Sequence, residues 1–498
     1  MGYRRGFDRF GGMRYTLTSI VTPGTAMDGG KRWAAITMAI VAAILIYQLF
    51  IPPSIGLADN GDFSRILGAV GLEYSTDNLA DRHFNYFVPK YKFGASGEWD
   101  ALVWTSENLL VLGAMAANRL GGAAGMFDVR ALGAIHVALF LVAVWLLLRL
   151  SARLGPATRS VISLLLALVF CDVGYAAYFN SLYSETASFL FLLLTLAAAM
   201  RLAEAPDSLP RLGVWLAACA LFVSAKPQNG LLAIPLAGYG FWVAYGRAHG
   251  RGRALVACSA ALLAAPIASS MSTPKWMMKH FMYNAVFYEL LRNSATPRQD
   301  LQELGLNPEF EEYRGTNIFS LDIPVEEPAF EAAFFDRIGP ARLGLFYLRH
   351  PGRLAGVAQR AAQSAFSQRP AYLGNFEKSC GRGPGAQSRE FQLWSKLRES
   401  AAPRSLWFVG IFFVGSAGAA LAVFPKTGSR QLRAAMVLQL ALAAMAIEQL
   451  LVAEAACGQY ELGKHLFLFN LLFDLCLCAN VVLATAWVSR TWRPGPNA

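Results

Sequence analysis

The sequence predicts an all-α, polytopic membrane protein whose chain crosses the bilayer about ten times. The first observation behind this prediction is the composition. Of the 498 residues, 55% are hydrophobic and only 15% are charged, and the mean hydropathy is +0.38. Soluble domains contain roughly 25% charged residues. The composition therefore indicates a membrane protein rather than a soluble one.

The second observation is a series of apolar runs long enough to span a bilayer. A spanning helix needs about 20 predominantly apolar residues. The run 109–126 is apolar too, but Arg119 and the glycine-rich 121-GGAAG-125 favour a surface or re-entrant helix there. The predicted spans are 33–51, 131–148, 160–179, 186–200, 212–224, 230–245, 254–272, 405–424, 433–452 and 465–488.

The third observation is the charge of the segments between these runs. Basic residues collect on the cytoplasmic side of membrane proteins. With the N-terminus inside, the short outside segments 180–185 and 225–229 hold one lysine between them, Lys226. The inside segments are all basic: 1–32, 149–159, 201–211, 247–253, 426–433 and 489–498. We therefore predict that both termini are cytoplasmic, and that topology rather than nucleic acid explains the net charge of +11.

This topology predicts the organisation of the chain in a bacterial cytoplasmic membrane. A cytoplasmic tail (1–32) precedes a transmembrane module (33–272) that includes an outer loop (52–130). An extracytoplasmic loop region (273–404), C-terminal transmembrane helices (405–488) and a second cytoplasmic tail (489–498) follow. The inside segments are too short to hold a nucleotide. We therefore expect the chemistry on the outer face.

The segment 58-ADNGDFSRI-66 follows the first predicted span almost directly. It brings Asp59, Asn60, Asp62 and Arg65 to the membrane surface. Asp-Asn-Gly-Asp is also a favourable turn, and Asp62 suits the N-cap of a short helix. The local pattern alone supports either a turn or a group of reactive carboxylates.

Three other outside segments carry polar residues that suit a sugar or a phosphate headgroup. Each has a structural alternative, because Ser184 and Glu185 suit a helix N-terminus and a lysine at a helix end can extend to the interface. Lys464 and His465 suit interfacial anchors as well. The candidate residues are Asn180, Tyr183, Glu185, Lys226, Gln228, Lys464 and His465.

The long loop 273–404 contains two amphipathic stretches, 276–293 and 331–366. Amphipathic, aromatic-rich helices lie on a bilayer or cover a cavity. Arg349, His350 and Arg353 form a basic group in 347-YLRHPGRL-354. This group suits either lipid-phosphate binding or a solvated face beside Pro351. Cys380 and Cys457 both fall in outside segments, but their spacing does not establish a disulfide.

The arrangement resembles the GT-C superfamily of integral membrane glycosyltransferases. Members of that superfamily have an N-inside first span followed directly by a long outer loop that opens with acidic residues. In 59-DNGDFSRI-66, Asp59 matches the carboxylate after the first span and Phe63 the aromatic residue four positions later. Asn60 stands where a glutamate is frequent. The stretches 178-YFNSLYSE-185 and 464-KHLFLFN-470 are similar to uncharacterised bacterial members.

The resemblance implies a glycosyltransferase that uses a polyprenyl-phosphate sugar as donor and a lipid- or glycan-linked hydroxyl as acceptor. Asp59 would be the catalytic base and Asp62 the second candidate. The phosphate would meet Lys226, Arg349, Arg353, Lys464 or His465. No ATP or soluble nucleotide sugar is needed, and the resemblance leaves open a divalent cation, Mg²⁺ or Mn²⁺, with Asp62 replacing the missing second acid.

Two other classes compete with this reading. A lipid or glycan transporter or flippase also tolerates carboxylates within spans, but internal repeats and broken helices are typical of that class. An O-antigen polymerase or ligase also combines about ten spans with a large outer loop, and needs no aspartate after the first span. A new glycosidic bond would distinguish an enzyme from a transporter.

Overall fold

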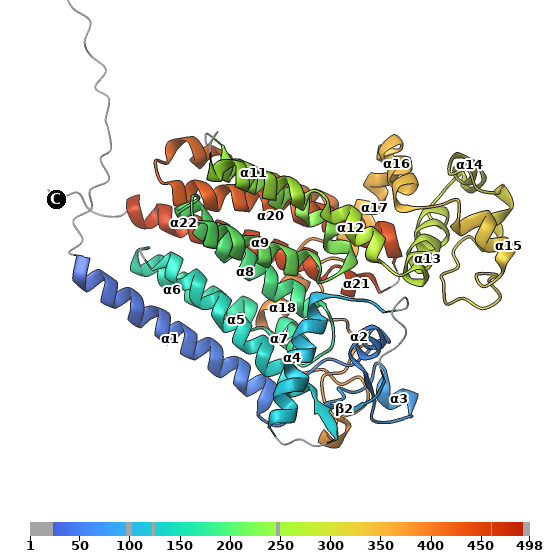
Figure 1. The fold of residues 1–498 in the computed structure, drawn as a ribbon, viewed down its shortest axis with the longest axis horizontal. Coiled ribbons are helices and arrows are strands. Elements are labelled where there is room, and N and C mark those ends of the chain that lie inside the picture. Colours follow the sequence, from blue (N-terminus) through green and yellow to red (C-terminus); the bar gives the residue numbers. More distant parts are fainter. Residues whose placement is uncertain are drawn as a thin grey trace, which may run out of the picture.

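The computed structural model describes residues 23–95, 102–121, 125–152, 154–245, 250–459 and 461–491. Most of the predicted cytoplasmic tails, 1–22 and 492–498, lie outside these ranges, and so do some of the basic residues that predicted the topology. The chain is 71% helical, and long helices run side by side through most of the molecule (Figure 1). The prediction of a predominantly α-helical, polytopic fold is confirmed.

Among the described residues, seven helical stretches are long and apolar enough to cross a membrane. One of them combines α11 (Arg251–Leu262) with α12 (Ala265–Ser272). An eighth is the pair α6 (Pro156–Leu165) with η1 (Leu166–Phe170) and α7 (Val173–Phe179), which is bent by 64°. The other long helices are α1 (Pro23–Phe50), α5 (Val129–Ser151), α8 (Glu185–Glu204), α19 (Leu406–Val423), α20 (Arg430–Cys457) and α22 (Phe467–Thr491).

The two remaining predicted spans form shorter helices. They are α9 (Leu209–Val223), and η2 (Pro227–Leu232) continuing into α10 (Ala233–Ala244). With 15 and 12 residues, α9 and α10 are shorter than a regular span. The count of ten and the orientation of the chain therefore stay predictions. The 15-residue helix α4 (Ser106–Leu120) replaces the apolar run 109–126 and agrees with a surface or re-entrant position.

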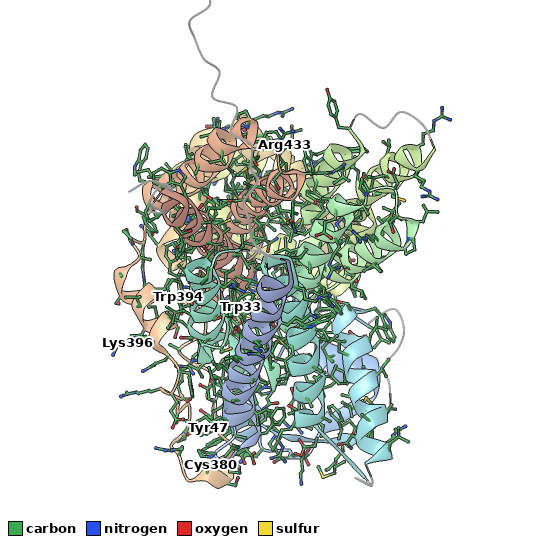
Figure 2. All side chains as sticks on the ribbon, turned by 90° about the vertical axis from the view of Figure 1, so that its left-hand side faces the viewer. Trp33, Tyr47, Cys380, Trp394, Lys396 and Arg433 are labelled. Atoms are coloured by element: carbon green, nitrogen blue, oxygen red, sulfur yellow. The ribbon has the colours of Figure 1, made fainter. Side chains whose placement is uncertain are left out.

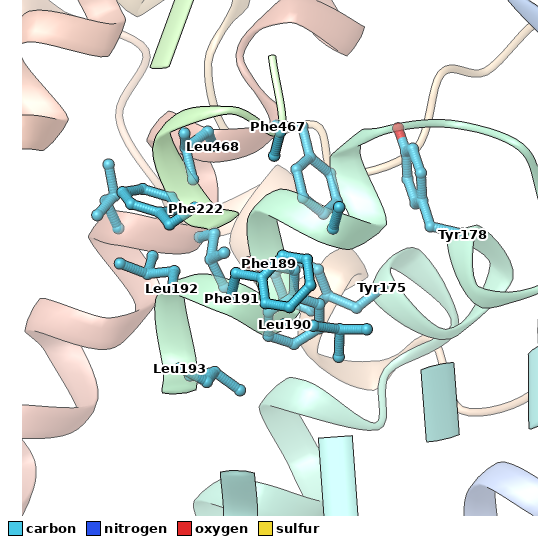
Figure 3. Packing of buried hydrophobic residues seen from close by; sticks show 14 of the residues in the cluster. Tyr175, Tyr178, Phe189, Leu190, Phe191, Leu192, Leu193, Phe222, Phe467 and Leu468 are labelled. Carbon is cyan, nitrogen blue, oxygen red and sulfur yellow. The ribbon is translucent and has the colours of Figure 1, made fainter. Parts of the chain in front are cut away.

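Helix α8 lies at the centre of the bundle and packs against α5, α9, α20 and α22. Nearly all its side chains are buried, which explains why it is apolar on every side. Phe189 on α8 packs against Tyr175 of α7, with ring centroids 5.3 Å apart (Figure 3). This aromatic core fixes the outer end of α7 beside the start of α8.

The first outer loop is not purely helical, and this corrects the all-α prediction for that loop. It contains α2 (Phe63–Val70), α3 (Leu79–Arg82) and a small antiparallel sheet. The sheet has the order β1 (Leu72–Tyr74), β2 (Lys90–Phe93), β3 (Met126–Asp128). The physical reason is the alternation in 90-KYKF-93, which buries Tyr91 while Lys90 and Lys92 stay exposed.

The long outer loop folds into a helical region with its own hydrophobic core (Figure 1). We call residues 275–364 the outer helical region. Both predicted amphipathic stretches are helical within it. Its elements are α13 (Lys275–Tyr283), η3 (Asn284–Leu291), α14 (Pro297–Glu303), η4 (Pro308–Tyr313), α15 (Pro328–Phe330), η5 (Glu331–Phe335), α16 (Pro340–Arg349) and α17 (Pro351–Ser364).

The end of the long loop returns to the first outer loop. Residues 374–376 lie between the segments 56–58 and 84–87. The backbone amides of Gly56 and Ala58 donate to the carbonyls of Asn375 and Gly374, at 3.0 and 2.9 Å, and Phe87 N donates to Phe376 O at 3.0 Å. After this contact follow η6 (Lys378–Cys380), α18 (Leu393–Ala401), η7 (Phe424–Lys426) and α21 (Leu462–His465).

We predict that Gly374→Ala destabilises the protein. A Cβ atom at Gly374 would lie 2.2 Å from the carbonyl oxygen of Asn85, which is backbone and is fixed by neighbouring hydrogen bonds. Overpacking of this kind costs about 1–3 kcal/mol, so the apparent Tm in detergent should fall. Gly383→Ala is the control, because a Cβ there meets nothing within 4 Å. Equal melting temperatures for both variants would contradict the close packing of the two loops.

Candidate functional site

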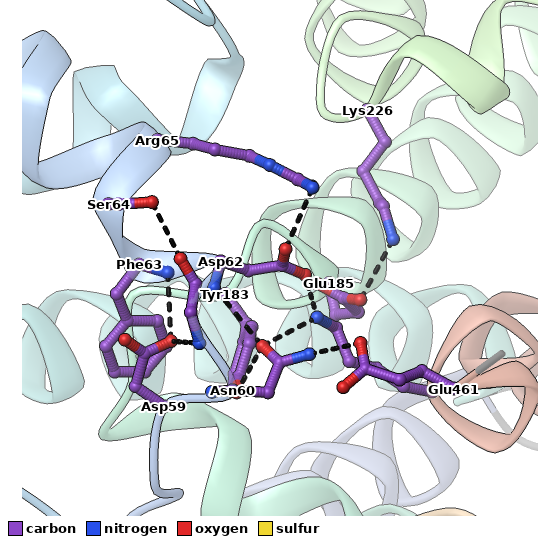
Figure 4. Close-up of polar contacts among 12 residues, drawn as sticks. Asp59, Asn60, Asp62, Phe63, Ser64, Arg65, Tyr183, Glu185, Lys226 and Glu461 are labelled. Atoms are coloured by element: carbon purple, nitrogen blue, oxygen red, sulfur yellow. Dashed lines mark hydrogen bonds and ion pairs between the residues drawn. The ribbon is translucent and has the colours of Figure 1, made fainter. Parts of the chain in front are cut away.

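A partly enclosed pocket lies where the first outer loop meets α8, η2, α13 and α21. Its polar lining comes from Asp62, Arg65, Tyr183, Glu185, Lys226, Gln228 and His465. Val103, Leu182, Met277 and Phe281 supply apolar walls. The free volume is about 50 Å³, enough for a few water molecules but not for a sugar. We call it the carboxylate pocket; Figure 4 shows most of its polar residues.

Asp59 is buried beside the pocket and fixes the loop. Its Oδ1 accepts hydrogen bonds from the amides of Gly61 (2.7 Å) and Phe63 (3.0 Å), and so caps the start of α2. Its Oδ2 accepts a hydrogen bond from the Tyr74 hydroxyl and lies 3.3 Å from Nδ1 of His83. Only 2% of Asp59 is exposed. Both oxygens are therefore occupied by the protein.

Asp62, in contrast, faces the pocket. Its carboxylate pairs with Arg65 at 2.9 Å and accepts a hydrogen bond from the ammonium of Lys464 on α21 (Figure 4). Its side chain makes no capping hydrogen bond to α2, so the expected N-cap role belongs to Asp59 instead. Asp62 is the aspartate of this segment that a substrate in the pocket would meet.

Asn60 connects the first outer loop to two other segments. Its Nδ2 donates to Glu461 at 2.5 Å, and its Oδ1 accepts from Lys464 at 3.1 Å. The Tyr183 hydroxyl accepts from the amide of Asn60 (2.9 Å) and donates to Ala58 O (2.8 Å). These contacts bring residues from positions 58–62, 183 and 461–464 into one hydrogen-bonded group.

The other side of the pocket comes from α8 and η2. Lys226 pairs with Glu185 at 2.9 Å, and Gln228 donates to Gln449 of α20 at 2.9 Å. Ser184 makes no capping hydrogen bond, so Glu185 is positioned by its lysine as well as by the helix start. Both cations that line the pocket, Arg65 and Lys226, are thus paired with a carboxylate, and the buried Lys464 pairs with Asp62 without lining the pocket.

Burial changes the protonation of the residues around α21. It lowers the pKa of the Lys464 ammonium to about 7, and the carboxylate of Asp59 opposes this change. It raises the pKa of Glu461, while the hydrogen bond from Asn60 opposes the rise. Burial, together with Lys226 and Lys464, lowers the pKa of His465 well below its ordinary value. His465 is therefore neutral at pH 7 and offers a hydrogen bond rather than a charge.

Four predicted binding residues lie elsewhere. Asn180 is fully buried, and its Nδ2 donates to the carbonyls of Leu49 and Ile55, so it ties α7 to the end of α1. His350 and Arg353 pair with Glu303 (2.6 Å) and Asp300 (2.9 Å) within the outer helical region, and Arg349 is exposed there. None of the four lines the pocket. His350 and Arg353 are held away from it by acidic partners in their own loop.

Two functional neighbours were not predicted from the sequence. Tyr74 and His83 contact Asp59 from β1 and from the end of α3. Their spacing from Asp59 follows no helical or strand period. The sequence signal that could have indicated the Tyr74 contact was a tyrosine in a strand-like stretch soon after Asp59.

The described residues contain no group of three histidine, cysteine, aspartate or glutamate side chains that could hold a metal ion. The aspartate pair also does not fit a divalent cation. Asp59 uses both oxygens for protein hydrogen bonds, and the Lys464 ammonium occupies the carboxylate of Asp62. The positive charges at this site are therefore those of the protein's own side chains, Arg65, Lys226 and Lys464.

The cysteines are free thiols in this structure. Cys380 is exposed, whereas Cys457 is buried at the end of α20. His136 is a buried core histidine, with hydrogen bonds to Phe179 O and to Glu107 at 2.8 and 2.9 Å.

A comparison with known protein families shows which family the chain matches. Residues 28–494 match the model of the YfdI N-terminal transmembrane domain. The chain belongs to this family. It is therefore a multi-pass membrane protein, which agrees with its apolar helices. No curated protein and no solved structure gives a significant match.

We predict that the two aspartates of this YfdI-family chain differ in their effect on stability. Asp59→Asn puts an amide where the carboxylate accepts from the Tyr74 hydroxyl and lies beside Nδ1 of His83. Leaving buried donors unpaired costs about 1–3 kcal/mol. Asp62→Asn keeps the turn intact, because Asp62 makes no cap. The apparent Tm should fall for Asp59→Asn and change little for Asp62→Asn. A larger fall in apparent Tm for Asp62→Asn than for Asp59→Asn would show that Asp62 holds the loop.

Proposed function

We propose that this chain is a membrane glycosyltransferase of the GT-C kind. It transfers a sugar from a polyprenyl-phosphate donor to an acceptor hydroxyl on the extracytoplasmic side. The observation that carries this proposal is the carboxylate pocket itself. A partly exposed aspartate and two cations, Arg65 and Lys226, line it at the ends of apolar helices, and the buried Lys464 pairs with that aspartate. A phosphate-linked sugar on a prenyl chain needs this combination of charge and apolar surface.

Asp62 is the proposed base. As the acceptor oxygen attacks the anomeric carbon, Asp62 takes the hydroxyl proton, and the bond from that carbon to the phosphate oxygen breaks. The phosphate leaves with the bonding electrons. This assignment reverses the order expected from the sequence, since Asp59 holds the turn and Asp62 faces the pocket.

The cations stabilise the departing phosphate. Positioned cations lower the energy of charge that develops in a transition state. Lys226 lines the pocket beside Glu185, and Lys464 contacts Asp62. Without substrate, Lys226 pairs with Glu185 and Lys464 pairs with Asp62. A phosphate competes for them, and in doing so leaves Asp62 freer to accept a proton. Donor binding thereby prepares the base.

The pocket must widen to hold a sugar, because its free volume is only about 50 Å³. Met277 and Phe281 on α13 form part of its wall. Helix α13 belongs to the outer helical region, whose core is separate from that of the bundle. Movement of α13 away from α2 would open the pocket without disturbing the buried helices.

Asp62→Asn should abolish most of the glycosyl transfer. Loss of a general base costs about 10²–10⁴-fold in rate, so we expect at least a 100-fold fall with a panel of polyprenyl-phosphate sugars and membrane acceptors. Asp77→Asn is the matched control, because it lies in the same loop with a fully exposed side chain. Full activity of Asp62→Asn would refute the proposed base.

Donor affinity should weaken as the pH rises through about 7. The pKa of Lys464 is about 7, so above that pH the ammonium is lost, whereas the phosphodiester of the donor keeps its charge. Between pH 7 and 8.5 we expect roughly a tenfold loss of affinity. Lys464→Arg stays charged and should bind almost independently of pH, while Lys378→Arg, on the exposed surface, should follow the wild type. A flat wild-type profile would exclude Lys464 as a phosphate ligand.

A transporter is the second candidate, and the bent pair α6–α7 favours it. Broken helices are typical of transporters, and Asp172 caps α7 at the break. The same vesicle assay separates the two classes. Accumulation of donor inside vesicles without a new glycosidic bond would support transport and exclude the enzyme.

A further inference from the structure

A second pocket shares no lining residue with the carboxylate pocket. It is formed by the segment 368–399 and has a volume of about 410 Å³. Its lining is rich in cations and amides: Arg369, Arg389, Lys396, Gln368, Gln387 and Gln392. Glu399 is its acidic residue. We call it the basic pocket.

The cations of the basic pocket are poorly neutralised. Arg369 is held in place by Asn375 and by Ser388 O, the latter at 3.0 Å. Arg389 and Lys396 are exposed, and neither side chain makes a hydrogen bond or an ion pair with any residue that the structure describes. Three cations with amide donors around one cavity attract and bind an anion.

The floor of the basic pocket is built on the transmembrane helices. Asp474 of α22 pairs with Arg398 of α18 at 3.0 Å and accepts from Trp394 at 2.9 Å. The amide of Ser395 donates to Asp172 at the N-terminus of α7, also at 2.9 Å. These contacts fix α18 against α22 and α7, so the pocket is part of a rigid framework. Figure 2 shows Trp394 and Lys396 together on one side of the molecule.

The pocket lies at the level where membrane helices end. Tyr47, on the last turn of α1, packs against Phe391 with ring centroids 5.9 Å apart. Arg398 donates to the carbonyl of Asn470, on the first turn of α22. Leu393 and Leu397, on either side of Lys396 in the sequence, are 66% and 50% exposed. Basic residues beside exposed leucines are typical of a helix at a lipid interface.

We propose that the basic pocket binds the phosphate headgroup of an anionic membrane lipid. Arg369, Arg389 and Lys396 hold the phosphate, while the acyl chains pass over the exposed leucines of α18. A soluble phosphate would gain nothing from that apolar surface, so the lipid is the favoured source. The site is independent of the proposed glycosyl transfer.

The test is titration of the purified, detergent-solubilised chain with phosphatidylglycerol, followed by native mass spectrometry. Each basic residue near a membrane surface contributes roughly a five- to tenfold gain in affinity for anionic lipid. Arg389→Ala with Lys396→Ala should therefore weaken binding by about 30-fold. Arg382→Ala with Arg404→Ala is the matched control, because both residues are exposed, lie in the same loop and do not line the pocket.

Equal affinity of the wild type and the Arg389/Lys396 double variant would overturn the proposal, and so would equal losses in the two double variants. Displacement of the lipid by millimolar inorganic phosphate would assign the pocket to a soluble anion and overturn the lipid source. Phosphatidylcholine should bind weakly to every variant. Unchanged melting temperatures without lipid would confirm that the variants are folded, as expected for side chains without protein partners.

Discussion

The carboxylate of Asp59 is the interaction on which the candidate site depends. A buried charge is costly unless hydrogen bonds surround it, and four groups from three neighbouring segments face Asp59: the amides of Gly61 and Phe63, the Tyr74 hydroxyl and the His83 ring. The carboxylate therefore closes the turn, starts α2 and attaches the sheet. Asp62, three residues later, projects into the pocket because Asp59 fixes the backbone before it.

Neither outer loop could form this site alone. The strand-like segment 374–376 pairs with the backbone directly before Asp59 and also with 84–87. Asn60 and Tyr183 extend the connection to α21 and to α8. Because segments far apart in the sequence converge on residues 56–62, the geometry of the pocket depends on the assembled bundle. This convergence also explains why so many side chains of a loop region are buried.

Much of the pocket was predictable because the predicted topology places these residues at helix ends on one side of the membrane. Asp62, Arg65, Glu185, Lys226 and Lys464 all follow or precede apolar runs, and all meet in the structure. The pairing of Arg353 with Asp300 was not predictable, since it depends on how the long loop folds on itself. Asn180 also looked like a binding residue, although a buried amide serves backbone carbonyls equally well.

The two pockets use their cations in opposite ways. In the carboxylate pocket each cation has a carboxylate partner, so under the proposed function an incoming phosphate would exchange one anion for another and free the proposed base. In the basic pocket Arg389 and Lys396 lack such partners among the described residues, so the proposed lipid phosphate would bind there without displacing an anion. Cations with carboxylate partners suit a site that must respond to its substrate, whereas cations without such partners suit a site that keeps its ligand bound. Tyr178 of α7 contacts a lining residue of each pocket. Its hydroxyl lies 3.5 Å from Gln368 O, and its ring centroid lies 5.8 Å from that of Tyr183. Tyr178 therefore connects Gln368 of the basic pocket to Tyr183 of the carboxylate pocket.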